Sequence, residues 1–270
     1  MKKKADPKAE LLRDQALLEK HGVPLPQELE QDRSMMAYFI QKTAIFLRPL
    51  DEAKTEGALI EASTQLQRSL ESELELLRPA LIVAGKKTQM ACTKGCDHCC
   101  SIRVSLGAPQ VLMLARYLRK NLTSTQLSDL RVRMASFERR VDAMPPLQQL
   151  LRSVMCPLNV DKACIAYAAR PTNCIGYHSF DVQRCIERAA NPEDDSIRVP
   201  SSQVRRMTTA LHIQAMWAGM KAMSLPYYEL EFIPALRIAL DDEEAGKKYV
   251  SGESVFASAH RPEVLAAQTT

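Results

Sequence analysis

Apolar residues recur at every third or fourth position along much of this chain, which is the spacing of one face of an α-helix. The clearest stripe predicts a helix over residues 56–77, and a second helix is expected over 27–46, after a short first helix that ends at Pro24. The stripe of the third helix consists of Leu59, Ala62, Leu66, Leu70, Leu74 and Leu77. We interpret these helices as a hairpin that packs on the rest of the chain; the alternative is a surface for a protein partner.

The helical spacing of apolar residues is interrupted at Gly85 and resumes near Pro109. Ile102, Val104 and Leu106 alternate with polar residues, which indicates one short extended piece. Pro109 suits the first turn of a helix, so a helix is expected from there to about residue 119.

The rest of the pattern is again helical, apart from residues 156–185. The last helix should be kinked by Pro234, and the tail beyond Lys248 is expected to be loosely held. Helices are expected over 124–143, 147–154 and 227–240, and around the stripe Ala210, Ile213, Trp217 and Met220. The pattern predicts a mainly α fold, a helical bundle.

Composition agrees with a globular helical protein. Of the 270 residues, 46% are apolar and 25% are charged, and the 9 glycines leave few positions for the positive φ angles of tight turns. The net charge of +4 demands no acidic partner, and no alternation of arginine with aromatic residues is visible, so binding to nucleic acid is not expected.

The chain has no apolar run of 18 residues, so no membrane span is expected. The lysines at its start are followed by Asp14 and Glu19 with no sustained apolar stretch, which is not the pattern of a secretory signal. We therefore expect a cytoplasmic protein.

The eight cysteines fall into two groups, and this grouping indicates a ligand set. In a reducing compartment such clusters hold metal more often than disulfides. On a helix, Cys92, Cys96 and either Cys99 or Cys100 would share one face, and the adjacent Cys99 and Cys100 should diverge. The predicted metal ligands are Cys92, Cys96, Cys99, Cys100, Cys156, Cys164, Cys174 and Cys185.

The second cysteine group should have irregular backbone. Cys156 and Arg170 each precede a proline, which disfavours helical backbone at those positions. Free backbone N–H groups in such loops can donate to thiolate sulfur. We interpret residues 1–85 as an N-terminal helical extension and 86–270 as the cysteine-cluster metal-binding domain with C-terminal helices, the metal-binding centre being irregular.

Other side chains near the cysteines have predicted roles. His98 and His178 could each replace a thiol as a ligand, although a locally hydrogen-bonded histidine is the preferred interpretation. Nearby cations could balance thiolate charge; these are Lys86, Lys87, Lys94, Arg103, Arg170, Arg184 and Arg188.

The spacing Cys-x3-Cys-x2-Cys at Cys92, Cys96 and Cys99 is often used for [4Fe-4S] ligation, whereas structural zinc sites favour paired Cys-x2-Cys. We expect zinc or iron and prefer a [4Fe-4S] cluster. The same spacing occurs in radical S-adenosylmethionine enzymes, but these need a β/α barrel, and strands are nearly absent from this pattern.

The full cysteine pattern resembles the YkgJ-type cysteine-cluster family, which is described as having a zinc- or iron-chelating domain. The resemblance covers about residues 88–190. It rests on Cys92-x3-Cys96-x2-Cys99-Cys100, Cys156-Pro157-Leu158, Cys164-Ile165-x-Tyr167, Arg170-Pro171-x-x-Cys174 and Cys185. Two departures are Ala163, where glycine or a basic residue is common, and Ile175, where arginine is frequent.

Flagellin lysine methylases share the Cys-x3-Cys-x2-Cys-Cys element. That similarity implies an alternative function, an iron-sulfur enzyme of protein methyl transfer. Whether the chain is an enzyme stays open at this point, because no Rossmann-type glycine loop for a nucleotide is visible.

Overall fold

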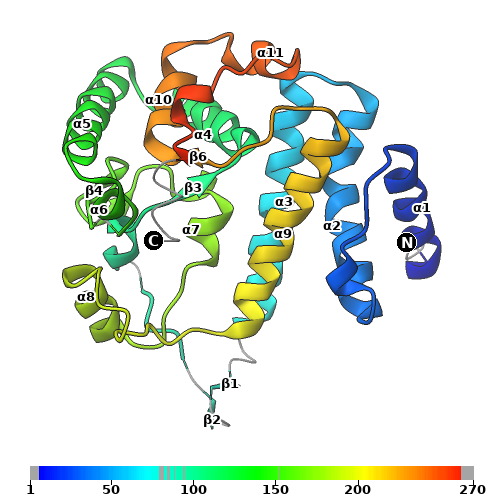
Figure 1. The fold of residues 1–270 in the computed structure, drawn as a ribbon, viewed down its shortest axis with the longest axis horizontal. Coiled ribbons are helices and arrows are strands. Elements are labelled where there is room, and N and C mark those ends of the chain that lie inside the picture. The colour runs from blue at the N-terminus through cyan, green and yellow to red at the C-terminus, as the bar shows by residue number, and fades with distance from the viewer. Residues whose placement is uncertain are drawn as a thin grey trace.

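Three long helices pack against one another on one side of the molecule (Figure 1). The computed structural model describes residues 6–78, 82–83, 86–87, 89–93, 95–151 and 153–262. The three helices are α2 (Arg33–Glu52), α3 (Glu56–Leu76) and α9 (Gln203–Ala222). Their apolar side chains belong to a hydrophobic core that also includes residues of α4 and α10. Removal of these facing stripes from water holds the helices together.

Side-chain caps set where the N-terminal helices begin. The Asp32 carboxylate accepts a hydrogen bond from the Ser34 N–H at 3.0 Å, so α2 starts at residue 33 and not at 27 as predicted. Residues 27–29 form a separate turn of 3-10 helix. The next predicted helix is confirmed as α3, and the Thr55 hydroxyl caps it by accepting from the Ala58 N–H at 3.2 Å.

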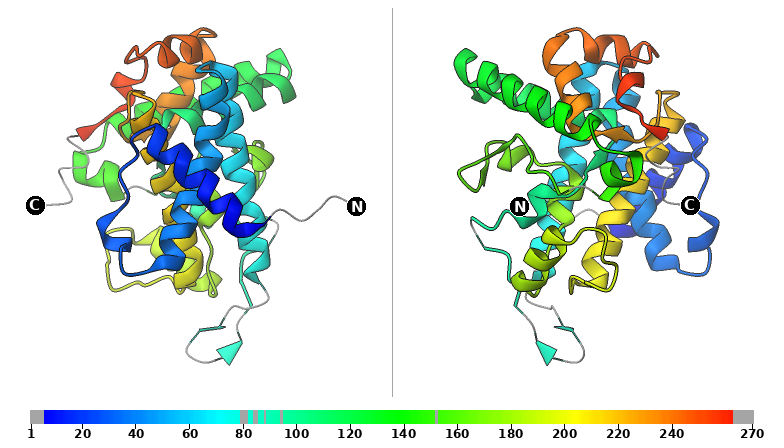
Figure 2. Two further views of the ribbon diagram at one scale, coloured as in Figure 1. Left: turned by 90° about the vertical axis from the view of Figure 1, so that its right-hand side faces the viewer. Right: turned by 60° about the vertical axis from the view of Figure 1, so that its left-hand side comes forward.

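The other longer helices form a second group, in which α10 packs on α4 and α5. Pro109 lies in the first turn of α4 as predicted, and α5 starts with a capping box formed by Thr123 and Gln126. Figure 2 shows α5 projecting outward beside α10. These helices are α4 (Ala108–Asn121), α5 (Ser124–Asp142), α6 (Pro146–Leu151) and α10 (Phe232–Asp241).

Strands are short throughout the described residues. Ser105 pairs with Glu231 and Leu106 with Leu230, which confirms the predicted extended piece near residue 105. The antiparallel pairs are β1 (Ile82–Val83) with β2 (Lys86–Lys87), β3 (Ser105–Leu106) with β6 (Leu230–Glu231), and β4 (Asn159–Val160) with β5 (Ala163–Cys164). The mainly α fold class is confirmed.

Two predictions about the C-terminal part are wrong. Because α10 begins at Phe232, Pro234 lies in its first turn, where it displaces no hydrogen bond and need not kink the helix. The segment after Lys248 is not loosely held as far as residue 262, because Tyr249 and Phe256 are fully buried in the main core. The Tyr249 hydroxyl also donates to the Pro226 carbonyl oxygen at 2.5 Å.

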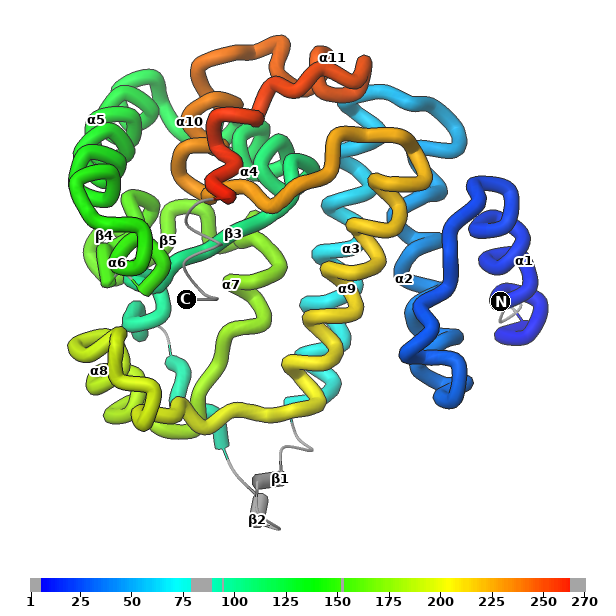
Figure 3. The backbone as a smooth tube through the Cα atoms, in the orientation of Figure 1, coloured from blue at the N-terminus to red at the C-terminus, as the bar shows by residue number. Residues whose placement is uncertain are grey.

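The remaining elements flank or connect these groups. Figure 2 shows α1 lying across the outside of the three-helix group, and Figure 3 traces the chain from α7 past α8 to the start of α9. No described helix combines the length and the apolar character that a membrane crossing requires. The elements are α1 (Pro7–Lys20), η1 (Gln27–Leu29), η3 (His98–Ser101), η4 (Tyr167–Ala169), α7 (Thr172–Gly176), α8 (Val182–Ala190), α11 (Ala245–Val250) and η5 (Ala257–Ala259).

A buried polar cluster lies where α2, α3 and α9 meet. The Tyr38 hydroxyl and the Lys42 ammonium both contact the Glu73 carboxylate. The ring of His212 is fully buried, with Nε2 3.9 Å from Glu73 Oε2 and Nδ1 2.9 Å from the Thr208 carbonyl oxygen. Burial lowers the pKa of His212 to about 4, so the folded protein holds this ring neutral.

Lowering the pH from 7 to 5 is therefore expected to reduce the free energy of unfolding by about 2 kcal/mol through His212. The unfolded chain binds this proton near pH 6.5, whereas the folded chain resists it until about pH 4. The stabilisation is complete above pH 6.5 and is lost as the pH falls toward 4. Urea unfolding at both pH values measures the effect.

Two variants control this measurement. His212→Gln should lose less stability between pH 7 and pH 5 than the unchanged chain, because the titrating ring is gone. His98→Gln should keep the full loss. The same pH dependence in all three proteins would show that His212 is not the responsible group.

Candidate metal centre

Backbone hydrogen bonds join the two cysteine groups directly. The Cys156 N–H donates to the Cys100 carbonyl oxygen at 2.8 Å, and the Ala91 N–H donates to the Ser179 carbonyl oxygen at 2.9 Å. In addition, α8 packs on η3, which brings Cys185 toward the first group. Segments far apart in sequence therefore meet in space, as a shared ligand set requires.

The first group is not an α-helix, so the prediction of a helical face is wrong. Gly95 has a φ of +88°, a conformation that favours glycine and ends any regular helix there. The chain then enters η3, where the Cys100 N–H donates to the Asp97 carbonyl oxygen at 2.8 Å. The divergence of Cys99 and Cys100 stays a prediction; the Cys99 side chain is exposed and that of Cys100 is half-buried.

The second group is more regular than predicted. Cys156 lies in irregular backbone before Pro157, as expected. Cys164 lies on β5, which follows a tight turn with positive φ at Asp161 and Lys162. The other two cysteines lie on helices, Cys174 on α7 and Cys185 on α8.

All eight cysteines are free, so no sulfur is committed to a disulfide. We call the eight side chains the thiol layer. Cys99 acts electrostatically on thiols of both groups and contributes to the raised pKa of Cys92, Cys164, Cys174 and Cys185. Cys96 interacts with Cys92, and Cys156 with Cys164 and Cys174, so the whole set is linked.

The surroundings hold most of these thiols in the neutral form. Burial raises the pKa of Cys156 and of Cys174 to about 12. The neighbouring Cys100 thiol raises the pKa of Cys99 far above its usual range. A reactive cysteine needs a lowered pKa, so a nucleophilic Cys99 paired with His98 is not favoured.

Backbone N–H groups point at several sulfurs, as the irregular backbone predicted. The Ser179 N–H donates to Cys92 Sγ at 3.3 Å. Hydrogen bonds from the Leu158 and Ala166 backbones act on Cys156 and Cys164 and lower the pKa of each thiol against the effect of burial. Such donors stabilise negative charge on sulfur, which is what a metal-bound thiolate carries.

Two arginines lie close enough to act on the thiols. Arg170 lowers the pKa of Cys99, Cys164 and Cys174, while its guanidinium stacks on the Tyr167 ring at 3.6 Å from the centroid. The charge-balancing role of Arg170 stays a prediction.

Arg205 is the second cation, and the sequence reasoning missed it. It is buried on α9, acts on Cys92 and donates to the Leu74 carbonyl oxygen at 2.5 Å, and its Nε atom has no hydrogen-bond partner among the described residues. No local signal could have identified it, because the contact depends on how α9 packs.

Three other predicted cations have carboxylate partners instead. Arg103 contacts Glu231 at 2.6 Å, Arg184 contacts Glu187 at 2.8 Å and Arg188 contacts Asp195 at 3.3 Å. Lys94 and the side chains of Lys86 and Lys87 lie outside the described residues.

His178 is buried and locally hydrogen-bonded, as the preferred interpretation held. Its Nδ1 lies 2.8 Å from the Gly176 carbonyl oxygen, and its Nε2 accepts from the Ser202 N–H at 2.8 Å. Both ring nitrogens are therefore used in tying α7 to the start of α9. His98 is half-buried at the start of η3.

The described side chains do not meet in a ready-made coordination sphere. No three cysteine, histidine, aspartate or glutamate side chains within residues 6–78, 89–93, 95–151 and 153–262 are arranged so as to hold a metal ion. The donor chemistry fits a thiophilic metal, since the thiols are free, adjacent and supplied with N–H donors and cations. Coordination would require several of these side chains to rotate toward a common centre.

Comparison with known proteins adds no relative. No family model, curated protein or solved structure matches the chain. The resemblance to YkgJ-type proteins therefore rests on the cysteine pattern alone.

Proposed function

We propose that this chain is a metal-binding protein that holds zinc or iron, with a [4Fe-4S] cluster preferred, through the eight cysteines of the thiol layer. The observation that carries this proposal is the direct hydrogen bond between Cys100 and Cys156, supported by the electrostatic links among all eight thiols. A packing role for cysteine would not explain why all eight cysteines fall into two sequence groups whose backbones are hydrogen-bonded to each other.

The groups around the thiols suit a bound metal because they include both sulfur donors and positive charges that can balance thiolate. Four thiolates on Zn²⁺ or on a [4Fe-4S]²⁺ core leave about two negative charges. Arg170 and Arg205 come from different segments of the chain, and each acts electrostatically on at least one thiol. The Ser179 N–H donates to Cys92 Sγ. When bound, such a metal would tie distant segments together or supply redox chemistry.

An iron-sulfur enzyme related to the flagellin lysine methylases is the second candidate. One observation favours an enzyme, namely a cavity of about 360 Å3. Tyr177 lines this cavity, and Cys99 and Cys174 act on the pKa of its hydroxyl. A purely structural site would be closed on all sides by protein ligands.

Anaerobic purification followed by metal and acid-labile sulfide analysis tests the proposal. A brown protein with iron and sulfide supports the cluster, and a colourless protein with stoichiometric zinc supports a zinc site. Absence of both metals, after attempted reconstitution with each, would overturn metal binding.

A cysteine variant tests the assigned ligands. Cys174→Ser should lower the metal content well below that of the unchanged chain, because the thiolate is the ligand that soft metals select. Ser101→Ala is the matched control, since Ser101 lies next to Cys100 but carries no sulfur. Equal metal contents in the two variants would contradict the assignment of Cys174.

A further inference from the structure

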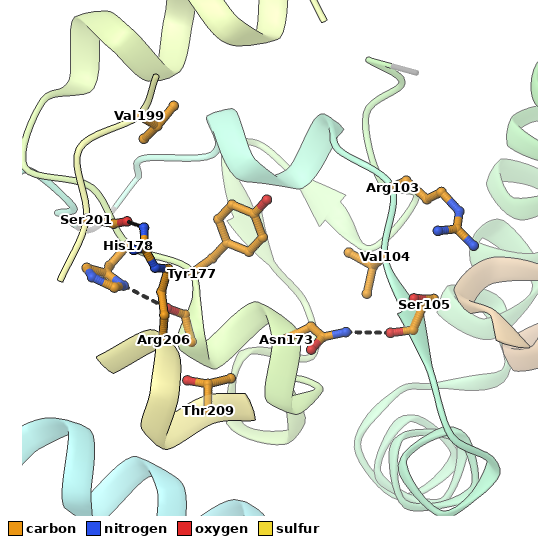
Figure 4. Close-up of a pocket in the computed structure, with 11 residues that line it drawn as sticks. Arg103, Val104, Ser105, Asn173, Tyr177, His178, Val199, Ser201, Arg206 and Thr209 are labelled. Atoms are coloured by element: carbon orange, nitrogen blue, oxygen red, sulfur yellow. Dashed lines mark hydrogen bonds between the residues drawn. The ribbon is translucent and has the colours of Figure 1, made fainter. Parts of the chain in front are cut away.

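The cavity beside the thiol layer has three walls (Figure 4). One wall is the chain entering β3 at Arg103–Ser105, the second is α7 with the residues that follow it, and the third is the start of α9 with residues 199 and 201. Its volume of about 360 Å3 falls at the lower end of the range for small-molecule sites.

Tyr177 forms one side of this cavity. It lines the cavity, and Figure 4 shows its ring standing between the Ser201 and Val104 sides. Tyr177 follows Cys174 by three residues in the sequence, and the nearby Cys99 and Cys174 contribute to a raised pKa of its hydroxyl.

The charge of the cavity comes from Arg206. Its guanidinium donates to Ser201 Oγ at 2.7 Å and has no ion pair with a carboxylate of the described residues. Arg103 is different, because Glu231 and Glu229 lie 2.6 and 3.6 Å from its nitrogens. Since Ser201 Oγ accepts from Arg206, its hydroxyl hydrogen remains free to donate to an anion.

The rest of the lining suits an apolar body. Val104 and Val199 face the cavity together with the Tyr177 ring. A side chain at Gly176 would collide with Thr209, since a Cβ there would lie 2.5 Å from Thr209 Cγ2. Glycine at this position therefore lets α7 approach α9 closely while the cavity stays open.

We propose that this cavity binds a small organic carboxylate. Arg206 and Ser201 hold its anionic group, and its apolar body packs on Val104, Val199 and Tyr177. A carboxylate carries the single charge that Arg206 leaves unmatched, and its planar shape fits a guanidinium. A phosphate dianion would bring excess negative charge next to the thiols. The binding itself does not depend on a metal.

Hexanoate, hexanamide and inorganic phosphate are the probes. The sole tryptophan of the chain, Trp217, lines a smaller cavity of about 150 Å3 that shares Ser105 and Asn173 with the first, so its fluorescence reports on binding. Hexanoate should bind with a Kd on the order of 1 mM. Hexanamide and phosphate should each bind at least about tenfold more weakly, because one lacks the charge and the other the apolar body.

Variants identify the side chain responsible. Arg206→Met should weaken hexanoate binding by about tenfold, and Arg206→Lys should retain part of it. Arg116→Met is the control, because Arg116 is exposed on α4 and does not line the cavity. Circular dichroism confirms that each variant is folded.

Three results would overturn the proposal: no hexanoate binding at concentrations up to about 10 mM, equal binding of hexanoate and hexanamide, or equal binding by Arg206→Met and Arg116→Met. Hexanoate binding without any bound metal would leave the carboxylate site standing even if the metal proposal failed.

Discussion

Replacing Phe46 with alanine is expected to lower the free energy of unfolding by about 3–5 kcal/mol. Phe46 is completely buried in the main core, where α2 crosses α9. Its ring packs on the backbone of α9 at Gly219, so closely that a Cβ on that glycine would lie 2.4 Å from Phe46 Cδ1. Two helices held at this distance cannot collapse fully into the space that the ring leaves. Guanidinium chloride unfolding measures the loss.

A double-mutant cycle separates this contact from general damage to the core. Gly219→Ala alone should be destabilising, because the new methyl group meets a ring in the core. In the Phe46→Ala background the same change should be neutral or stabilising, by up to about 1 kcal/mol, since alanine favours helix over glycine. Additive effects would contradict the contact. Leu76→Ala, at a residue 76% exposed, should change stability by less than about 0.5 kcal/mol.

Removal of the proposed metal is expected to lower the free energy of unfolding by about 3–4 kcal/mol. This magnitude follows if free metal is held at 100 to 1,000 times its Kd before removal. Metal bound by both cysteine groups would stabilise the folded chain because unfolding separates residues 92–100 from residues 156–185. Thermal unfolding before and after treatment with a chelator measures the change, which corresponds to a fall in Tm of roughly 5–15 °C.

The decisive comparison uses a double variant that lacks one proposed metal ligand from each cysteine group. Cys99→Ser combined with Cys174→Ser removes a sulfur from each group, so the chelator should no longer change its Tm. A chain that unfolds at the same temperature with and without metal would refute the stabilising role, even if metal analysis detects an ion.

The sequence predicts the helices well where the apolar stripe and the cap agree. The stripe that includes Leu59 and Leu66 identifies α3, and Thr123 identifies the start of α5, because both signals are local. The pattern fails for the C-terminal segment, where burial of Tyr249 and Phe256 depends on a surface made by α10 and other distant parts of the chain.

The residues of the candidate site also fall into those that local sequence signals identify and those that depend on distant packing. The two cysteine groups can be found by counting cysteines, and the proposed charge-balancing role of Arg170 follows from its neighbours in sequence. Arg205 and Arg206 cannot be found in this way, because they reach the thiol layer and the cavity only through the packing of α9. The helical interpretation of residues 92–100 failed because Gly95 takes a left-handed conformation that the cysteine spacing does not reveal.

The hydrogen bond between Cys100 and Cys156 also has a consequence for biosynthesis. A ribosome that adds about 5–20 residues per second needs several seconds to pass from the first of these cysteines to the second, and longer to reach Cys185. During that interval the first four sulfurs emerge without their partners. The complete layer can therefore assemble only after Cys185 has been synthesised, and until then the early thiols lack the contacts that the folded chain gives them.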